Sequence, residues 1–209
     1  MNDKEFEVAL VDAAFALGAE AGWSRVSPAA AARHAGLDLV KARAMFPCTG
    51  KILKKFGRQA DAFALTGAAE QGDVRDRLFD ILLRRFDYLQ ARRAGVVALM
   101  RHLPACPPLA VALAGMNLVS MGWLLEGAGV DATGFSGALK KRGLLAVWLY
   151  AMRAWAEDES PDMTATMAAV DTALARAETF ALRFSPARPK AAEPDPEPPA
   201  PEVEPPAAT

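Results

Sequence analysis

One stretch near the carboxyl end of the chain limits the possible folds more than any other. From Lys140 to Asp171 it reads KKRGLLAVWLYAMRAWAEDESPDMTATMAAVD. A long apolar run ends at an acidic segment, and a second run with helical spacing follows. Ser160 suits an N-cap, Pro161 suits the first helical turn, and Asp162 complements the positive end of the helix dipole. The stretch therefore predicts two long helices joined by a short turn, at 139–157 and 161–184.

Helical patterns also fill the rest of the chain. Apolar residues make up 52% of the 209 residues, which is enough to bury a core. Period-2 alternation bounded by Asn-Gly or Asp-Gly turns, the signature of a hairpin, does not occur. The sequence therefore predicts an all-α fold. The further predicted helices are 6–21, 28–35, 39–45, 51–70, 74–93, 96–103 and 107–126, and a glycine-rich connection covers 127–137.

Three parts of the chain differ in character. Residues 1–50 contain the short helices of a helix-turn-helix module, and residues 51–184 contain the longer helices of a bundle. Residues 185–209 hold nine of the fifteen prolines and five acidic residues, so this segment cannot pack a core and is expected to be disordered. It is either a tether or partner motif, or simply a solvated tail.

The expected compartment is the cytoplasm. The amino-terminal segment MNDKEFEVAL is acidic and lacks the basic-then-apolar pattern of a signal peptide. Two isolated cysteines, Cys48 and Cys106, fit simple thiols in a reducing compartment. The segment Pro107–Leu125 carries no charge and is about long enough to span a bilayer, at roughly 20 residues. A spanning helix needs partners, and no second segment resembles one, so this segment is expected to be a buried helix.

A local excess of positive charge lies in and after the predicted helix-turn-helix. Residues 21–58 contain eight Lys or Arg and one acid, Asp38, whereas the whole chain has a net charge of −1. Lys41 and Arg43 lie on the presumed recognition helix and are expected to reach base edges. Phosphate contacts are expected from Arg33, Lys51, Lys54 and Lys55. The alternative is that these helices only maintain the fold, with the basic residues as a solvated face.

The same region resembles the amino-terminal domain of the TetR regulators. The matching elements are AlaLeuValAspAlaAla in the first helix, Gly22-Trp23, AlaAlaAlaArgHisAlaGly in the second helix, and Phe46-Pro47 after the third. The resemblance implies a TetR-like fold, in which a three-helix helix-turn-helix module precedes a helical bundle. It also implies a small effector held inside that bundle.

A second resemblance covers about residues 8–180 and points to the Coq-nine family of ubiquinone-biosynthesis accessory proteins, which share the TetR fold. The amino-terminal matches are Gly22-Trp23, Gly36-Leu37-Asp38, Ala42-Arg43, Met45-Phe46-Pro47 and Ala60-Asp61. The carboxy-terminal matches are Trp123, Lys141-Arg142, Leu144-Leu145, Asp158, Ser160-Pro161-Asp162 and Thr166, and the run from Leu144 to Thr166 has no gap. The resemblance implies that the bundle holds an isoprenoid quinone intermediate and presents it to a partner hydroxylase.

Both resemblances place an apolar ligand between the helices of the bundle. Adaptable methionines and aromatic side chains suit such a cavity. The expected lining residues are Leu99, Met100, Leu113, Met116, Met121, Trp123, Leu124, Trp148, Met152 and Trp155. For any one of them, an ordinary place in the core is the simpler interpretation. Both resemblances also imply a homodimer formed through the last two helices, where Ala168, Ala169, Ala173 and Ala177 permit close packing.

No catalytic, metal or cofactor motif emerges. The two histidines, His34 and His102, lie on different predicted helices, and GxGxxG, P-loop and GxSxG motifs do not occur. The acidic segment 157–162 is better explained by helix capping than by acid catalysis. We therefore expect neither an enzyme nor a bound cofactor or metal.

The longer gapless match favours a Coq-nine-like lipid-binding accessory protein of ubiquinone biosynthesis, with some peripheral contact to the inner membrane. Trp123 and its apolar neighbours are then part of the lipid or partner surface. The alternative is a dimeric TetR-type transcriptional regulator that binds DNA and responds to a small apolar ligand.

Overall fold

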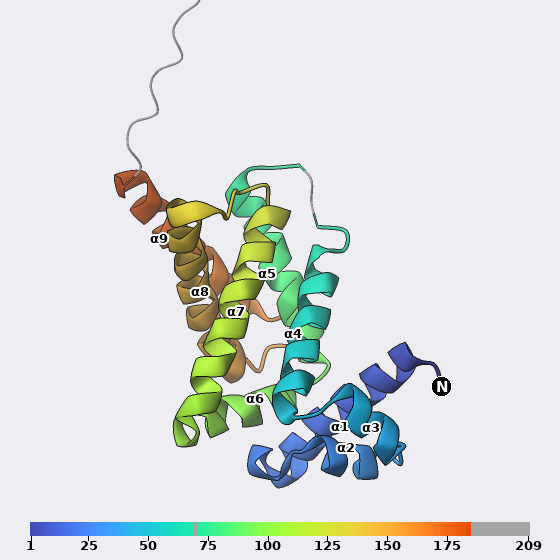
Figure 1. The fold of residues 1–209 in the computed structure, drawn as a ribbon. Helices are drawn as coiled ribbons and strands as arrows, with labels where there is room; N and C mark the ends of the chain where they lie inside the picture. Colours follow the sequence, from blue (N-terminus) through green and yellow to red (C-terminus); the bar gives the residue numbers. More distant parts are fainter. Residues whose placement is uncertain (69–70, 185–209) are drawn as a thin grey trace, which may run out of the picture.

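The computed structural model describes residues 1–68 and 71–184, and this described part is helical throughout (Figure 1). The predicted tail 185–209 lies outside the described residues. The α-helices are α1 (Asp3–Ala21), α2 (Pro28–His34), α3 (Leu39–Met45), α4 (Thr49–Leu65), α5 (Val74–Gln90), α6 (Arg93–His102), α7 (Pro107–Gly127), α8 (Gly134–Glu157) and α9 (Thr164–Phe184). Two short 3-10 turns, Trp23–Arg25 and Leu103–Ala105, follow α1 and α6.

Side-chain caps explain where several helices begin. Asn2 and Glu5 form a capping box at the start of α1. Ser27, Asp38 and Asp73 accept hydrogen bonds from the first turns of α2, α3 and α5. The exposed N–H groups of these helix ends are thereby satisfied by residues that the sequence places just before each apolar run.

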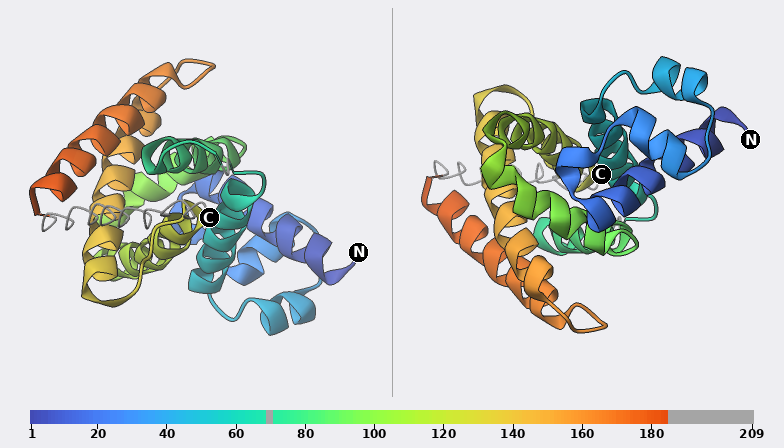
Figure 2. Two further views of the ribbon diagram at one scale, coloured as in Figure 1. Left: turned by 90° about the horizontal axis from the view of Figure 1, so that it is seen from above. Right: turned by 90° about the horizontal axis from the view of Figure 1, so that it is seen from below.

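The first three helices form a small module at one end of a larger bundle (Figures 1 and 2). Phe6 and Leu10 of α1 are buried, as are Ala31 of α2, Ala42 of α3 and Phe46 after α3. Small alanines on α2 and α3 let these short helices approach α1 closely. This core holds α3 in place while leaving its other side in solvent.

Helices α4, α5, α7, α8 and α9 form the bundle. Its centre is aromatic, because Phe86 of α5 stacks on Trp148 at a centroid distance of 4.5 Å and lies 6.0 Å from Trp155. The indole Nε1 of Trp155 donates to Gln90 Oε1 at 2.9 Å. The interior is thus filled by large side chains from α5 and α8.

Two connections link the module to the bundle. One is α4, and the other is the packing contact between α1 and α6. Trp23 Nε1 donates a buried hydrogen bond of 2.8 Å to the carbonyl oxygen of Gly95. A Cβ atom at Gly95 would overlap the backbone of Phe15, so glycine is what lets α6 lie this close to α1. The predicted boundary between residues 50 and 51 falls inside the first turn of α4.

The predicted start of the last helix is wrong by three residues. We expected Ser160 as N-cap and Pro161 in the first turn, but α9 begins at Thr164, after Met163 at φ 55°. Asp158 contributes to the cap, because its carboxylate accepts hydrogen bonds from the N–H and hydroxyl of Thr166 at 2.8 and 2.7 Å. It also accepts from the N–H of Ser160 at 3.0 Å and from its hydroxyl. The segment therefore does act in capping, through Asp158 and also through the predicted Ser160, whose Oγ accepts a hydrogen bond of 3.0 Å from the N–H of Thr164.

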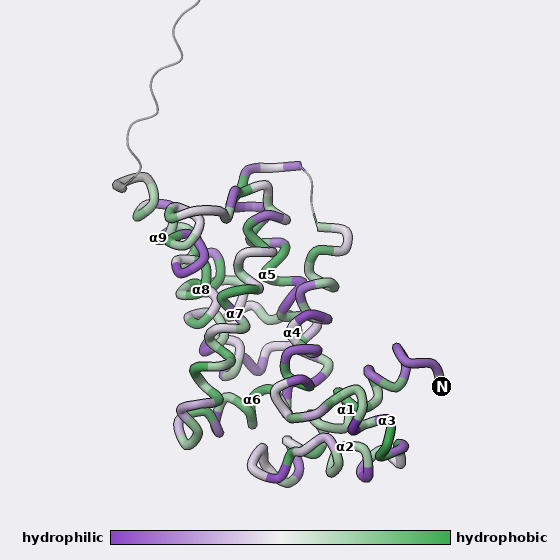
Figure 3. The backbone as a smooth tube through the Cα atoms, viewed as in Figure 1, coloured by the Kyte–Doolittle hydropathy of each residue, from purple (hydrophilic) through white to green (hydrophobic). Residues whose placement is uncertain are grey.

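Helix α7 is less buried than we expected. Of the described helices, only Pro107–Gly127 is long and apolar enough to cross a membrane by length and composition, a test that the core helix of a soluble protein also passes. Its buried residues are Ser120, Met121, Leu124 and Leu125, all in the carboxy-terminal half. Figure 3 colours much of this helix toward the hydrophobic end of the scale. The prediction of a buried helix is therefore correct for one half of α7 and wrong for the other.

Candidate nucleic-acid interface

Helices α2 and α3 form a helix-turn-helix. Gly36 ends α2 at φ +63°, in the left-handed region that favours glycine. Asp38 then starts α3, because its Oδ1 accepts a hydrogen bond of 2.6 Å from the backbone N–H of Lys41. The tight turn and the cap together set the direction of α3 relative to α2.

Helix α3 has a buried side and an exposed side. Ala42 is buried against the module core, and Met45 is half-buried. Val40, Arg43 and Ala44 are exposed, and the spacing of three and four residues places them on one face of the helix. Val40 is 78% exposed, although it is apolar. Figure 1 shows α3 at the outer edge of the module.

Two of the six predicted DNA-contacting residues are turned toward α1. Lys41 Nζ lies 2.6 Å from Asp3 Oδ1 and 5.0 Å from the centre of the Phe6 ring. The hydrogen bond and charge of Lys41 lower the pKa of the Asp3 carboxyl. Lys55 forms an ion pair with Glu7. In this structure, both ammonium groups are therefore already paired with carboxylates of the same chain.

The other four predicted residues face solvent. Arg33 on α2, Arg43 on α3, and Lys51 and Lys54 on α4 are all exposed. Within residues 1–68 and 71–184, none of the four forms an ion pair. Arg43 Nη1 lies 3.5 Å from the carbonyl oxygen of Pro47, which is a weak contact. These four cations are therefore available to an external anion.

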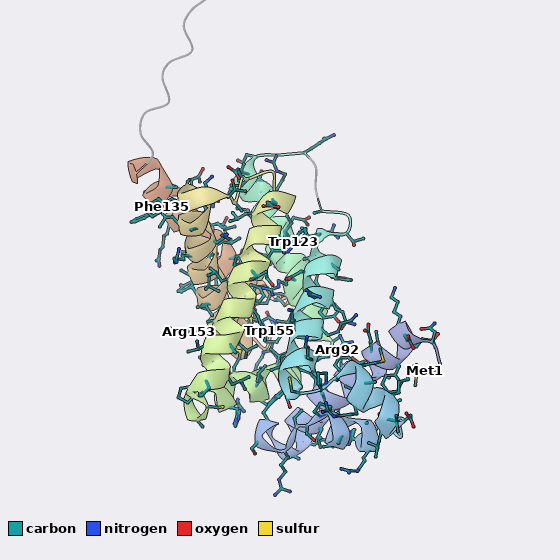
Figure 4. The ribbon with its side chains drawn as sticks, viewed as in Figure 1. Met1, Arg92, Trp123, Phe135, Arg153 and Trp155 are labelled. Atoms are coloured by element: carbon teal, nitrogen blue, oxygen red, sulfur yellow. The ribbon has the colours of Figure 1, made fainter. Side chains whose placement is uncertain are left out.

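The ten predicted ligand-lining residues differ in burial, and most of them lie in the core. Met121, Leu124, Trp148 and Trp155 are buried in the core together with Leu99 and Met152, whereas Met100, Leu113 and Met116 are half-buried. Trp123 is 61% exposed on α7, while Trp155 lies inside the bundle (Figure 4). In the described state these side chains fill space, and a chamber lined by them remains a prediction.

Two open pockets stand out in the described part of the chain. One has a volume of about 740 Å³ and lies where the end of α4, the start of α5 and the end of α7 meet, with Leu65, Arg77 and Trp123 among its lining residues. The other has a volume of about 510 Å³ and runs along α9 from Asp171 to Phe180. Of the ten predicted residues, only Trp123 lines either pocket.

A buried polar cluster in the bundle was missed by the sequence reasoning. Arg85 of α5 is 3% exposed, and its Nε lies 3.1 Å from Asp61 Oδ1 of α4. Ser120 of α7 donates to Asp61 Oδ2 at 2.5 Å, and Arg85 Nη2 donates to Asn117 Oδ1 at 3.2 Å. The guanidinium also stacks on Trp148 at 4.3 Å. The cluster thus ties together α4, α5, α7 and α8.

Two opposing effects act on the pKa of Arg85 in this cluster. Burial lowers the pKa of Arg85, and the charge of Asp61 opposes that shift. Arg85 Nη1 is buried without a hydrogen-bond partner among the described residues. A single acid on the apolar side of α4 was the signal in the sequence, but nothing local identified Arg85 as its partner 24 positions away.

The described residues contain no group of three or more His, Cys, Asp or Glu side chains that could hold a metal ion.

Comparison with known proteins gives no matching family model and no matching curated protein. Solved structures do match. A TetR transcriptional regulator from Nitrosomonas europaea superposes with a TM-score of 0.67 at 19% identity, over 84% of this chain and 99% of that one.

Two further matches agree with the first. A TetR transcriptional regulator from Rhodococcus sp. RHA1 has a TM-score of 0.59 at 16% identity, over 84% of this chain and 97% of that one. A TetR-family transcriptional regulator from Streptomyces coelicolor has a TM-score of 0.55 at 21% identity, over 86% of this chain and 85% of that one. The predicted all-α, TetR-like fold is confirmed. These comparisons give no support to the finer resemblance to the Coq-nine family.

Proposed function

We propose that this chain is a homodimeric, DNA-binding transcriptional regulator that responds to a small apolar ligand. One observation carries the proposal: Arg43 stands exposed on the second helix of a helix-turn-helix, and exposed cations flank it on α2 and α4. The whole chain has a net charge of only −1, so this positive surface is local. Arg33, Lys51 and Lys54 neutralise phosphates in this proposal, which holds the module on a duplex.

A dimer places two such modules on one duplex. Helix-turn-helix proteins of this kind read two half-sites about one helical turn apart. Helix α8 exposes the side chains of Leu139, Leu149 and Tyr150. A second copy packed on this side would cover apolar side chains that otherwise face water. We expect light scattering to give twice the mass of the chain and Leu149→Arg to halve it, whereas an unchanged mass would contradict this interface.

The pocket beside Trp123 is where the proposal places the ligand. Its volume of about 740 Å³ suits a small molecule, and Leu65 at the end of α4 lies in its wall. A ligand there would contact the helix that joins the two regions. If the two modules of the dimer can adopt two arrangements, the ligand would shift the equilibrium between them. The size of that shift is set by the difference between the affinities of the ligand for the two arrangements.

The test of DNA binding is a titration of the full chain with the duplex from upstream of its own gene, followed by fluorescence anisotropy at several salt concentrations. We expect affinity to fall steeply with salt, because phosphate contacts release counterions. The double variant Arg33→Ala/Lys54→Ala should weaken binding and reduce the salt slope by about 1 per lost contact. Arg101→Ala is the control, because Arg101 is exposed on α6, outside both the exposed cations of α2 to α4 and the side of α8 that is proposed for the dimer. Equal binding by both variants would contradict the proposal.

A second candidate is the Coq-nine-like lipid-binding accessory protein. The observation that favours it is the exposed apolar side of α7, which includes Val111, Val119 and Trp123. That surface suits an isoprenoid lipid or a partner hydroxylase. Native mass spectrometry and lipid extraction of the isolated protein test it: a co-purified isoprenoid that is lost in Trp123→Ala, in a protein that shows no salt-dependent duplex binding, would favour this function over DNA binding.

A further inference from the structure

The exposed face of α3 has an unusual composition for a surface that contacts DNA. We name Val40, Arg43 and Ala44 the reading face. Lys41, the other cation on this helix, is not part of it, because its ammonium group is held between Asp3 and the Phe6 ring. The reading face therefore presents one guanidinium beside two apolar side chains, and Val40 is 78% exposed.

The core of the module does not require Val40 to be apolar. The buried side of α3 is Ala42, and Phe46 follows it into the core, while Val40 points away from both. A valine in water gains nothing for folding, and its β-branched side chain slightly disfavours a helix. An exposed apolar side chain in the middle of a cationic surface fits an apolar group on the partner of that surface.

The major groove of DNA offers one such apolar group, the C5 methyl of thymine. Guanine offers two acceptors, O6 and N7, that match a guanidinium. Resting on the proposed DNA-binding function, we infer that the reading face recognises half-sites in which thymine methyl groups contact Val40 and Ala44, next to a guanine bound by Arg43. The exposed cations of α2 and α4 complement the negative charge of the phosphate backbones.

Spacing along the helix supports one compact recognition site. Side chains three and four positions apart on a helix have Cβ atoms about 5–6 Å apart. Stacked base pairs are about 3.4 Å apart. Val40, Arg43 and Ala44 therefore span about two or three neighbouring base pairs, and the inference predicts that thymine and guanine are adjacent or nearly so in each half-site.

The experiment starts with selection of duplexes from a randomised library by the full-length protein. The selected duplex is then remade with deoxyuridine in place of each thymine in turn, which removes one methyl group and leaves the hydrogen-bonding edges unchanged. We expect binding to weaken about fourfold at each contacted position, the factor that corresponds to ~0.8 kcal/mol per buried methylene-sized group. Replacing the guanine by 7-deazaguanine should also weaken binding, but not in Arg43→Ala.

Variants assign the effect to the reading face. Val40→Ala should bind the thymine duplex less tightly than the unaltered protein does and should no longer distinguish thymine from deoxyuridine at one position. Val40→Thr, which retains a methyl group and the branched shape, is the matched control and should keep that distinction. Both substitutions lie on an exposed position, so the fold should survive.

Three other outcomes are informative. If thymine and deoxyuridine duplexes bind equally while salt-dependent binding persists, the inference fails and the DNA-binding function stands. If no duplex is enriched and binding is absent at low salt, the proposed function itself fails. If Val40→Ala changes the mass of the protein in solution and leaves duplex binding as it was, Val40 belongs to a contact between copies of the chain, and the inference is overturned.

Discussion

The two regions of this molecule use arginine in opposite ways. In the amino-terminal module, Arg33 and Arg43 extend into water. In the bundle, Arg85 is buried against Asp61 and Trp148. A cation in water loses little when it changes partners, whereas a buried cation that loses its partner is left in a medium that solvates it poorly. Exposed charge in the module is therefore suited to external ligands, and buried charge in the bundle is committed to holding helices together.

The largest expected effect is the loss of stability on removing the buried arginine, Arg85. Arg85→Leu leaves the carboxylate of Asp61 in the interior without its cation, so we expect a loss of about 3–5 kcal/mol in the free energy of unfolding. Arg84→Leu is the matched control on the same helix, because Arg84 pairs with Asp80 in a half-exposed position and should lose at most about 1 kcal/mol. Urea denaturation of both variants measures the difference, and similar losses would mean that burial does not distinguish them.

The next effect concerns the joint between the regions. Gly95→Ala places a Cβ atom against the backbone of Phe15, so α1 and α6 must move apart, at a cost of about 1–3 kcal/mol. Gly115→Ala is the control, because nothing lies within 4 Å of its added Cβ on α7. That variant should gain about 0.5–1 kcal/mol from the better helix propensity of alanine. Calorimetry should show opposite shifts in Tm, and shifts of the same sign would show that the joint tolerates the extra atom.

A third effect tests a buried carboxylate of the bundle that is held by hydrogen bonds from N–H and hydroxyl groups. Burial raises the pKa of Asp158, but hydrogen bonds from Ser160 and Thr166 outweigh burial and hold the pKa below its usual value. A carboxyl whose pKa is lower in the folded state stabilises the fold above its unfolded pKa of about 3.9, and that stabilisation is lost as the pH falls toward the folded pKa.

We therefore expect the stability of the protein to decrease as the pH is lowered from about 4. Asp158→Asn should be less stable by about 0.5–2 kcal/mol at neutral pH, as for other lost caps, and should lose less on acidification. Glu159→Gln, an exposed change next to it, should follow the unaltered protein. Thermal melts at pH 7 and pH 3 make the comparison, and parallel pH profiles for Asp158→Asn and the unaltered protein would exclude Asp158 as the cause.

The smallest expected effect on stability comes from releasing a lysine of the amino-terminal module, Lys41, from its ion pair with Asp3. Asp3→Asn removes the carboxylate that holds Lys41, so we expect an unchanged Tm and tighter binding to non-specific duplex DNA at low salt. Asp171→Asn also removes one negative charge, but it lies on α9 beside Arg75. Anisotropy titrations of the two variants separate a local effect from one of net charge, and an equal gain in both would favour net charge.

Local chemistry made four helix starts in the described residues predictable from the sequence, those of α2, α3, α5 and α7. Pro28, Asp38 and Pro107 act within one helical turn of themselves, and α2, α3 and α7 begin where those residues indicate. The other predicted starts differ from the structure by two to five residues, and α8 begins at Gly134, inside the predicted glycine-rich connection 127–137. The start of α9 was also not predictable from local chemistry. Its cap joins Asp158 to Thr166 across eight positions, and the turn between them passes through the positive φ of Met163.

Contacts between distant segments account for the other differences. Lys41 was expected to read bases, but its partner Asp3 lies 38 positions away on α1. The apolar composition of α7 indicated burial, yet composition does not say whether another helix covers each side, and Trp123 is exposed. The candidate surface on α2, α3 and α4 was visible as a local excess of charge, whereas the cluster around Arg85 required the tertiary fold.

The continuity of α4 has a consequence for gene exchange between related proteins. Its first turn follows α3 directly, and Asp61 near its far end belongs to the cluster with Arg85. A chimaera joined at residue 50 would combine the amino-terminal module of one protein with the α4 and bundle of another. Exchanges that carry α4 together with Arg85, Ser120 and Trp148 would keep the cluster intact, so crossover points beyond α8 should yield more soluble hybrids than those near the amino terminus.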